Sequence, residues 1–196
     1  MTWRWLAASV LVAATACSSQ AAVTPGPNGT TPDLTKLIMA AHLRPCPSSS
    51  TAAVTGGLPD VTLSCLGHGP SVHMAGLTGQ PTVINIWGSW CIPCQAEEKF
   101  LSSAYNAVHR QVRFLGVDTV DQADSALDFD AHVQPPVHFP SVFDPDKKVL
   151  LGLHFPGPPE TVYLDAAGHV VHVNRVPYTS TKQVTHDIAA YLHIPT

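Results

Sequence analysis

Cys91 and Cys94 are the residues whose type and spacing point most directly to chemistry. Residues three positions apart on a helix lie on one face about one turn from each other, so two such cysteines can form a disulfide without moving the backbone. The unpaired N–H groups and the dipole at a helix start favour a thiolate, which makes Cys91 the expected nucleophile. Cys94, one turn inside, is then the resolving thiol, and Pro93 suits the first turn because its missing N–H costs nothing there.

Other uses of a CxxC pair agree less well with this sequence. A tetrahedral zinc site needs further ligands, and neither a second CxxC nor a nearby HxxxH accompanies the pair. Attachment of haem c requires a histidine directly after the second cysteine, where Gln95 stands. An inert structural disulfide stays open as an alternative, although it would not need a strand that leads the pair onto a helix start.

A buried strand followed by a helix is expected to position the two cysteines. The run 82–87, Thr-Val-Ile-Asn-Ile-Trp, is nearly continuous in apolar and β-branched residues, which is typical of a strand covered on both faces. Apolar residues at helical intervals then predict a helix over 93–108 that starts at or just after Cys91. The cysteines therefore lie where a buried strand passes into a helix.

The other predicted elements alternate between strands and helices. Strands are predicted over 61–65, 71–74, 112–117, 139–143, 161–164 and 169–173, and helices over 34–43, 123–131 and 184–192. The first two of these strands can pair as a hairpin. The alternation predicts an α/β fold with a central sheet.

Three further cysteines lie outside the central motif. If Cys17 carries a lipid, an even number of cysteines remains. For a protein outside the cytoplasm, this number suggests two disulfides. Because Cys91 and Cys94 pair with each other, the simplest connectivity joins Cys46 to Cys65. This structural bond would close a loop of about 20 residues and stabilise the fold by roughly 3 kcal/mol.

The amino-terminal residues predict export. Arg4 is followed by an apolar stretch at 6–16, which is shorter than the roughly 20 residues of a spanning helix and has the length of a signal-peptide core. The small residues before Cys17 resemble a bacterial lipobox, although Ala14 stands where such motifs more often have leucine. Cys17 is therefore the predicted lipidation site, and an ordinary signal peptide or an uncleaved anchor stay open as alternatives.

These observations divide the chain into three parts. Residues 1–16 are predicted as the signal peptide, and residues 17–57 as a lipidated, flexible leader that contains a short helix. Residues 58–196 are predicted as the folded domain. The amino terminus would attach this domain to the outer face of the cytoplasmic membrane.

Composition argues against several classes of ligand. Charged residues make up 12% of the chain and the net charge is −4, so no basic surface is expected to bind nucleic acid. The 11 histidines are scattered, and His169 and His172 fall on opposite faces of a predicted strand. We therefore predict neither a metal site nor a bound cofactor.

Two segments carry a resemblance to a known family. The segment 85–94, Asn-Ile-Trp-Gly-Ser-Trp-Cys-Ile-Pro-Cys, resembles the active-site segment of the membrane-anchored thioredoxin-like proteins of the TlpA and ResA group. The segment 157–168 resembles the family's G-x-P-x-T stretch with the strand and turn that follow it. The resemblance implies a thioredoxin-like fold, with a central mixed β-sheet flanked by helices and, in this chain, an N-terminal β-hairpin extension.

The same resemblance implies roles for further residues. Glu97 matches an acidic residue that handles the proton of the resolving thiol, and it shares a helix face with Cys94; a solvated glutamate is the alternative. Trp90 matches a tryptophan that shields the disulfide and contacts substrate, and Pro159 matches a cis-proline packed against the disulfide. Pro158 departs from the pattern, because it has no N–H to pair with a substrate strand.

The function implied is that of an extracytoplasmic thiol-disulfide oxidoreductase, which acts on protein thiols and disulfides and receives electrons from a membrane partner. The resemblance favours a reductase, as in cytochrome c maturation, over an oxidase that forms disulfides in exported proteins. A peroxiredoxin-type peroxidase would have Thr or Ser at position 88, where Gly88 stands. A copper carrier is a further alternative, although carriers resembling this fold usually space their cysteines one residue wider.

Overall fold

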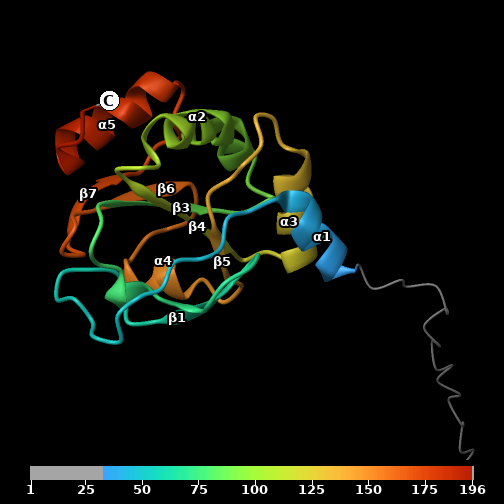
Figure 1. Cartoon of the computed structure of the whole chain (residues 1–196), viewed down its shortest axis with the longest axis horizontal. Helices are drawn as coiled ribbons and strands as arrows, with labels where there is room; N and C mark the ends of the chain where they lie inside the picture. The colour runs from blue at the N-terminus through green and yellow to red at the C-terminus, as the bar shows by residue number, and fades with distance from the viewer. Residues whose placement is uncertain (1–32, 196) are drawn as a thin grey trace, which may run out of the picture. The chain divides into compact units, whose positions relative to one another are not determined.

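A seven-stranded mixed β-sheet forms the centre of the computed structural model, which describes residues 33–195 (Figure 1). The strands are β1 (Thr62–Cys65), β2 (Val72–His73), β3 (Thr82–Trp87), β4 (Arg113–Thr119), β5 (Ser141–Asp144), β6 (Glu160–Leu164) and β7 (Val170–Asn174). They lie in the order β2-β1-β5-β4-β3-β6-β7. β3, β4 and β5 run parallel, and the remaining pairs are antiparallel. The predicted mixed sheet and its amino-terminal hairpin, β1–β2, are confirmed.

β3 is the strand that leads to the cysteines, and it is buried along its whole length. It pairs with β4 on one edge and with β6 on the other. Its bounds are those that the apolar run predicts. Because both faces and both edges are covered, the chain leaves β3 at a fixed point on the carboxyl edge of the sheet.

The helices cover the sheet on two faces. They are α1 (Leu34–Ala41), α2 (Ile92–Val108), α3 (Ala123–His132), α4 (Lys148–Gly152) and α5 (Thr181–Leu192), with a short 3-10 helix at Met74–Gly76. Buried side chains of α1, α2, α3 and α5 join one hydrophobic cluster, and those of α4 join the other. Figure 1 shows α2 and α5 on the side of the sheet opposite to α4.

The described part of the predicted leader, residues 33–57, packs on the folded domain. Ala41 and Leu43 are buried in the cluster that includes α2 and α3, and α1 contacts α3. Cys46 is buried in the other cluster and forms the predicted disulfide with Cys65. The predicted signal peptide and Cys17 lie outside the described residues. Within 33–195, none of the helices has the length and apolar character needed to cross a bilayer.

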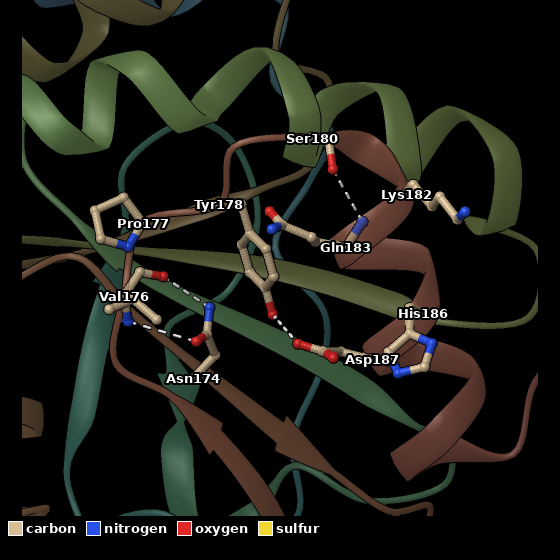
Figure 2. Close-up of a pocket in the computed structure, with 9 residues that line it drawn as sticks. All are labelled: Asn174, Val176, Pro177, Tyr178, Ser180, Lys182, Gln183, His186 and Asp187. Atoms are coloured by element: carbon tan, nitrogen blue, oxygen red, sulfur yellow. Dashed lines mark hydrogen bonds between the residues drawn. The ribbon is translucent and has the colours of Figure 1, made fainter.

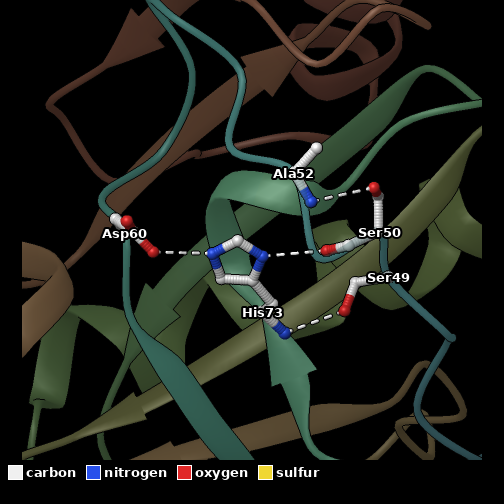
Figure 3. A network of polar contacts seen from close by, with 5 residues as sticks. All are labelled: Ser49, Ser50, Ala52, Asp60 and His73. Carbon is white, nitrogen blue, oxygen red and sulfur yellow. Dashed lines mark hydrogen bonds and ion pairs between the residues drawn. The ribbon is translucent and has the colours of Figure 1, made fainter.

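A polar network around His73 fastens the segment before β1 to the hairpin (Figure 3). Its Nδ1 lies 2.8 Å from the carbonyl oxygen of Ser50, and its Nε2 lies 2.7 Å from Oδ1 of Asp60. The His73 backbone N–H donates to Oγ of Ser49 at 2.8 Å. Because both ring nitrogens face acceptors, Ser50 first and Asp60 second raise the pKa of His73.

Some elements differ from their predicted bounds. The hydrophobic pattern does not predict α4. This helix begins where both side-chain oxygens of Asp144 accept backbone N–H groups, from Lys148 and Val149, at 2.9 Å each. α5 begins at Thr181 rather than at 184, because Oγ of Ser180 accepts from the N–H of Gln183 and caps the helix. Short side-chain caps of this kind leave little trace in hydrophobic periodicity.

Candidate active site

The Cys91–Cys94 disulfide lies at the start of α2, directly beyond β3. Cys91 is the N-cap residue, and its sulfur accepts a hydrogen bond from the Cys94 N–H at 3.3 Å. Both side chains are buried, with exposed fractions of 4% and 3%. Exposure therefore does not separate the two sulfurs, whereas position does: Cys91 faces the unpaired N–H groups of the first helical turn, which stabilise a thiolate.

Glu97 lies one turn beyond Cys94 on α2 and is buried, with 1% of its surface exposed. Its Oε1 accepts from Nδ2 of Asn85 at 3.0 Å, and its Oε2 accepts from the N–H of Tyr178 at 2.9 Å. Burial raises the pKa of Glu97 to about 7, against the opposing effect of these two hydrogen bonds. A carboxyl with this pKa can both take up and release a proton near neutral pH.

Asn85 and Tyr178 belong to this site, although no motif in the sequence predicts a role for them. Asn85 is the amide within the apolar run of β3, and its burial among β-branched neighbours is the signal that could have marked it. Tyr178 lies between β7 and α5 and has no comparable signal, because its contact with Glu97 depends on a distant turn of the chain.

Exposed apolar side chains lie beside the buried disulfide. Trp90 and Ile92 flank Cys91 and are 52% and 76% exposed. Nε1 of Trp90 donates to the carbonyl oxygen of Thr119 at 3.2 Å, and the next residue, Val120, is also exposed. Apolar groups exposed at this point can contact the backbone and side chains of another protein.

The prolines that the resemblance places at the site lie directly before β6. The peptide bond between Pro158 and Pro159 is cis. Glu160 pairs with Ile86 of β3, so Pro159 lies beside the carboxyl end of the strand that leads to Cys91. Both prolines are half-buried.

Further carboxyl groups are buried on the same side of the sheet. Glu98 of α2 accepts from Oγ of Ser102 at 2.9 Å, and burial raises its pKa to about 7. Asp130 of α3 and Asp118 of β4 also have raised pKa values, in both cases chiefly because they are buried. No sequence pattern marks these three residues as buried, because isolated acidic residues usually lie on the surface.

A cavity of about 440 Å³ lies next to Tyr178, between the end of β7 and the first turns of α5 (Figure 2). Val176, Pro177, Lys182, His186 and Asp187 are among the residues that line it. The Tyr178 hydroxyl donates to Oδ2 of Asp187 at 2.7 Å. Neither Glu97 nor the two cysteines of the disulfide are among the residues that line this cavity.

The sequence matches one protein family and relatives that are named for thiol-disulfide exchange. The sequence profile of the Redoxin family matches residues 53–191. The thiol:disulfide interchange protein DsbE of Xylella fastidiosa (strain Temecula1) is 29% identical over 125 residues, which cover 63% of this chain and 61% of the relative. The thiol-disulfide oxidoreductase ResA of Bacillus subtilis is 29% identical over 121 residues, which cover 61% of this chain and 65% of the relative. The chain thus spans less than two thirds of the length of these relatives.

Solved structures show the same fold. DsbF from MTB, described in mixed oxidized and reduced forms, is 27% identical, with a TM-score of 0.60 over 68% of this chain and 98% of that one. A secreted Mycobacterium tuberculosis disulfide oxidoreductase homologous to E. coli DsbE is 25% identical, with a TM-score of 0.58 over 67% of this chain and 96% of that one. The expected thioredoxin-like fold is confirmed.

Proposed function

Because the chain belongs to the Redoxin family, whose profile matches residues 53–191, we propose that it is a thiol-disulfide oxidoreductase that uses the Cys91–Cys94 pair. The observation that carries this proposal is a disulfide at a helix start, one turn from a buried carboxyl, Glu97, whose pKa is raised to about 7. The substrates are thiols or disulfides of other proteins, as the names of the DsbE and ResA relatives suggest.

In the reductase direction, the Cys91 thiolate attacks one sulfur of a substrate disulfide and displaces the other sulfur as a thiolate. The Cys94 thiolate then attacks Sγ of Cys91, which forms the Cys91–Cys94 disulfide and releases the substrate's second thiolate. The electron pair passes from the enzyme to the substrate, whose thiolates take up protons. Glu97 accepts the proton that Cys94 loses, since it shares a helix face with Cys94 and titrates near neutral pH.

Substrate contacts are assigned to the residues around the disulfide. Trp90, the residue before Cys91, offers an exposed indole to the substrate. Pro159, at the cis bond directly before β6, faces the substrate chain. Pro158 supplies a carbonyl oxygen but no N–H, so a substrate strand forms one backbone hydrogen bond fewer there than at an ordinary residue.

We favour the reductase direction, with a membrane protein as electron donor and cytochrome c maturation as the corresponding task. Disulfide formation in exported proteins is the alternative. The reduction potential of the Cys91–Cys94 couple distinguishes them. A value near that of thioredoxin, about −270 mV, supports a reductase, and a value near about −120 mV supports an oxidase.

The chain is proposed to work outside the cytoplasm, attached through lipid on Cys17 after removal of residues 1–16. The secreted M. tuberculosis relative supports export. Mass spectrometry of the mature protein should find a diacylglyceryl-modified Cys17 as the first residue. An unmodified amino terminus at another position would contradict lipidation.

A trapping experiment tests the proposed chemistry. A Cys94→Ser variant, reduced and mixed with oxidised insulin, should form a covalent complex on a non-reducing gel that dithiothreitol dissolves. The Cys91→Ser variant should form none. A complex with Cys91→Ser alone would reverse the two roles, and the absence of a complex with both variants would contradict the proposed activity.

A further inference from the structure

Val120 directly follows β4, and its backbone lies in the left-handed region, at a φ of 54°. Five non-glycine residues of the described range 33–195 have a positive φ, and Val120 is the only β-branched residue among them. In this conformation the Cβ atom crowds a backbone carbonyl oxygen, a strain that glycine avoids and asparagine tolerates. A valine is therefore among the least favourable residues for this backbone position.

The two neighbours of Val120 bind the turn that precedes the disulfide. On one side, the carbonyl oxygen of Thr119 accepts from Nε1 of Trp90 at 3.2 Å. On the other side, Oδ2 of Asp121 accepts from the backbone N–H of Ser89 at 2.6 Å. These two bonds join the residues before and after Val120 to two successive residues of the turn. They place Val120 beside the active-site surface.

The Val120 side chain does not serve the hydrophobic core. It is 49% exposed, and neither hydrophobic cluster of the described residues includes it. Its backbone N–H donates to the carbonyl oxygen of Asp144 at 3.3 Å, a bond that any residue except proline could form. Neither core packing nor backbone pairing thus requires a valine, although the valine strains the chain. Strain of this kind is concentrated at functional sites.

The exposed surface beside Val120 is apolar. Trp90 and Ile92, which flank Cys91 in the sequence, are 52% and 76% exposed. We propose that Val120 is a specificity-determining residue: with the Trp90 indole, it contacts an apolar residue that flanks the disulfide of a protein substrate. Such a contact removes apolar surface of both chains from water. The inference rests on the proposed function of the Cys91–Cys94 pair and adds the class of protein disulfide that the pair prefers.

Two synthetic peptides test this preference. Each contains one intramolecular disulfide, and they differ only in whether leucine or serine flanks the cysteines. In a single turnover, the reduced full chain should reduce the leucine peptide about tenfold faster. Val120→Asn keeps the left-handed backbone without the apolar group. This variant should lower the ratio of the two rates about threefold, because a half-exposed valine contributes less than a fully buried one.

Val171→Asn is the matched control. Val171 is 42% exposed and lies on β7, which β3 and β6 separate from β4. Its replacement removes a similar apolar group away from the cysteines and should leave the ratio of the two rates unchanged. A wild-type ratio near one, or a ratio that Val120→Asn does not lower, would overturn the inference.

Stability separates a substrate contact from a structural role. Relief of the strain should raise the urea midpoint of Val120→Asn by roughly 0.5 M. The oxidised variant should react with dithiothreitol at the wild-type rate. A lower midpoint would show that Val120 serves the fold and would overturn the inference. A wild-type dimer that Val120→Asn dissociates would also overturn it, because a second copy would then cover this surface.

The same peptides distinguish this inference from the proposed function. If the wild type reduces neither peptide, the proposed function fails and the inference fails with it. If the wild type reduces both peptides at the same rate, the proposed function stands and only the inference fails.

Discussion

The backbone N–H of Tyr178 donates to Oε2 of Glu97 at 2.9 Å, although the two residues are 81 positions apart in the sequence. The other carboxylate oxygen is held by Asn85, so β3, α2 and the segment before α5 together surround one carboxyl group. This arrangement keeps Glu97 out of water without leaving its oxygens unpaired. The pKa of Glu97 is raised because the effect of burial outweighs that of the two hydrogen bonds.

Replacement of Glu97 by glutamine should slow thiol-disulfide exchange. The variant cannot take the proton of Cys94, and loss of a general base typically costs about a hundredfold or more in rate. Because the pKa of Glu97 lies at about 7, the pH–rate profile of the wild type should bend near neutral pH, and that bend should vanish in Glu97→Gln. Stopped-flow measurement of insulin reduction between pH 5 and 9 would show both effects.

Glu98→Gln serves as the matched control for this experiment, since Glu98 is the neighbouring buried carboxyl with a pKa also near 7. It accepts from Ser102 rather than from β3 or Tyr178. Its variant should keep the bend near neutral pH. Equal loss of the bend in the two variants would remove the special role given to Glu97.

Glu98 should affect stability instead. Burial raises its pKa in the folded state to about 7 from an ordinary 4.5, so the folded protein binds the proton more tightly than the unfolded chain. The resulting stabilisation is full below pH 4.5 and is lost as pH rises to about 7. The free energy of unfolding of Glu98→Gln, measured in urea, should therefore depend less on pH than that of the wild type. At pH 8 it should exceed the wild-type value by roughly 2 kcal/mol or more. An unchanged slope would contradict the raised pKa.

The sequence predicts the elements around the cysteines well because their signals are local. The buried run of β3 and the periodicity of α2 each lie within one continuous segment, and the α2 start is marked by Pro93. Glu97 is proposed as a site residue from the family resemblance and its spacing from Cys94. Its burial is not predictable in this way, because it depends on Tyr178, which only the complete fold brings near.

The buried carboxyl groups show the same limit more strongly. Asp118 directly follows the run 112–117 that the sequence predicts as a strand. The strand instead continues to Thr119, and α3 covers this end of the sheet. Likewise, the leader composition of residues 48–57 does not indicate that Ser49 and Ser50 bind His73. Polar contacts between distant segments carry no periodic signal.

The Cys46–Cys65 disulfide should stabilise the fold without changing the redox chemistry. It joins residues 19 positions apart, for which the loop-entropy relation gives about 3 kcal/mol. β1, which carries Cys65, is separated from β3 by β5 and β4. The double variant Cys46→Ala/Cys65→Ala should therefore unfold at lower urea concentration, while the reduction potential of the Cys91–Cys94 couple stays constant. A shifted potential would show that the two disulfides are coupled.

Gly88 should be required for the position of Trp90. A Cβ atom at this residue would lie 2.6 Å from Nε1 of the Trp90 indole and 3.1 Å from the carbonyl oxygen of Thr119, which this nitrogen binds. Gly88→Ala therefore forces the indole away from Thr119. The emission of Trp90 should shift to longer wavelength, and exchange with protein substrates should slow about tenfold, the loss expected for one hydrogen bond. Gly157→Ala, where an added Cβ meets no atom within 4 Å, is the control for the emission shift. Because dithiothreitol does not need the indole surface, it should react with Gly88→Ala as fast as with the wild type or faster. If the variant reacts more slowly with both protein substrates and dithiothreitol, the substitution has instead damaged the cysteine pair itself.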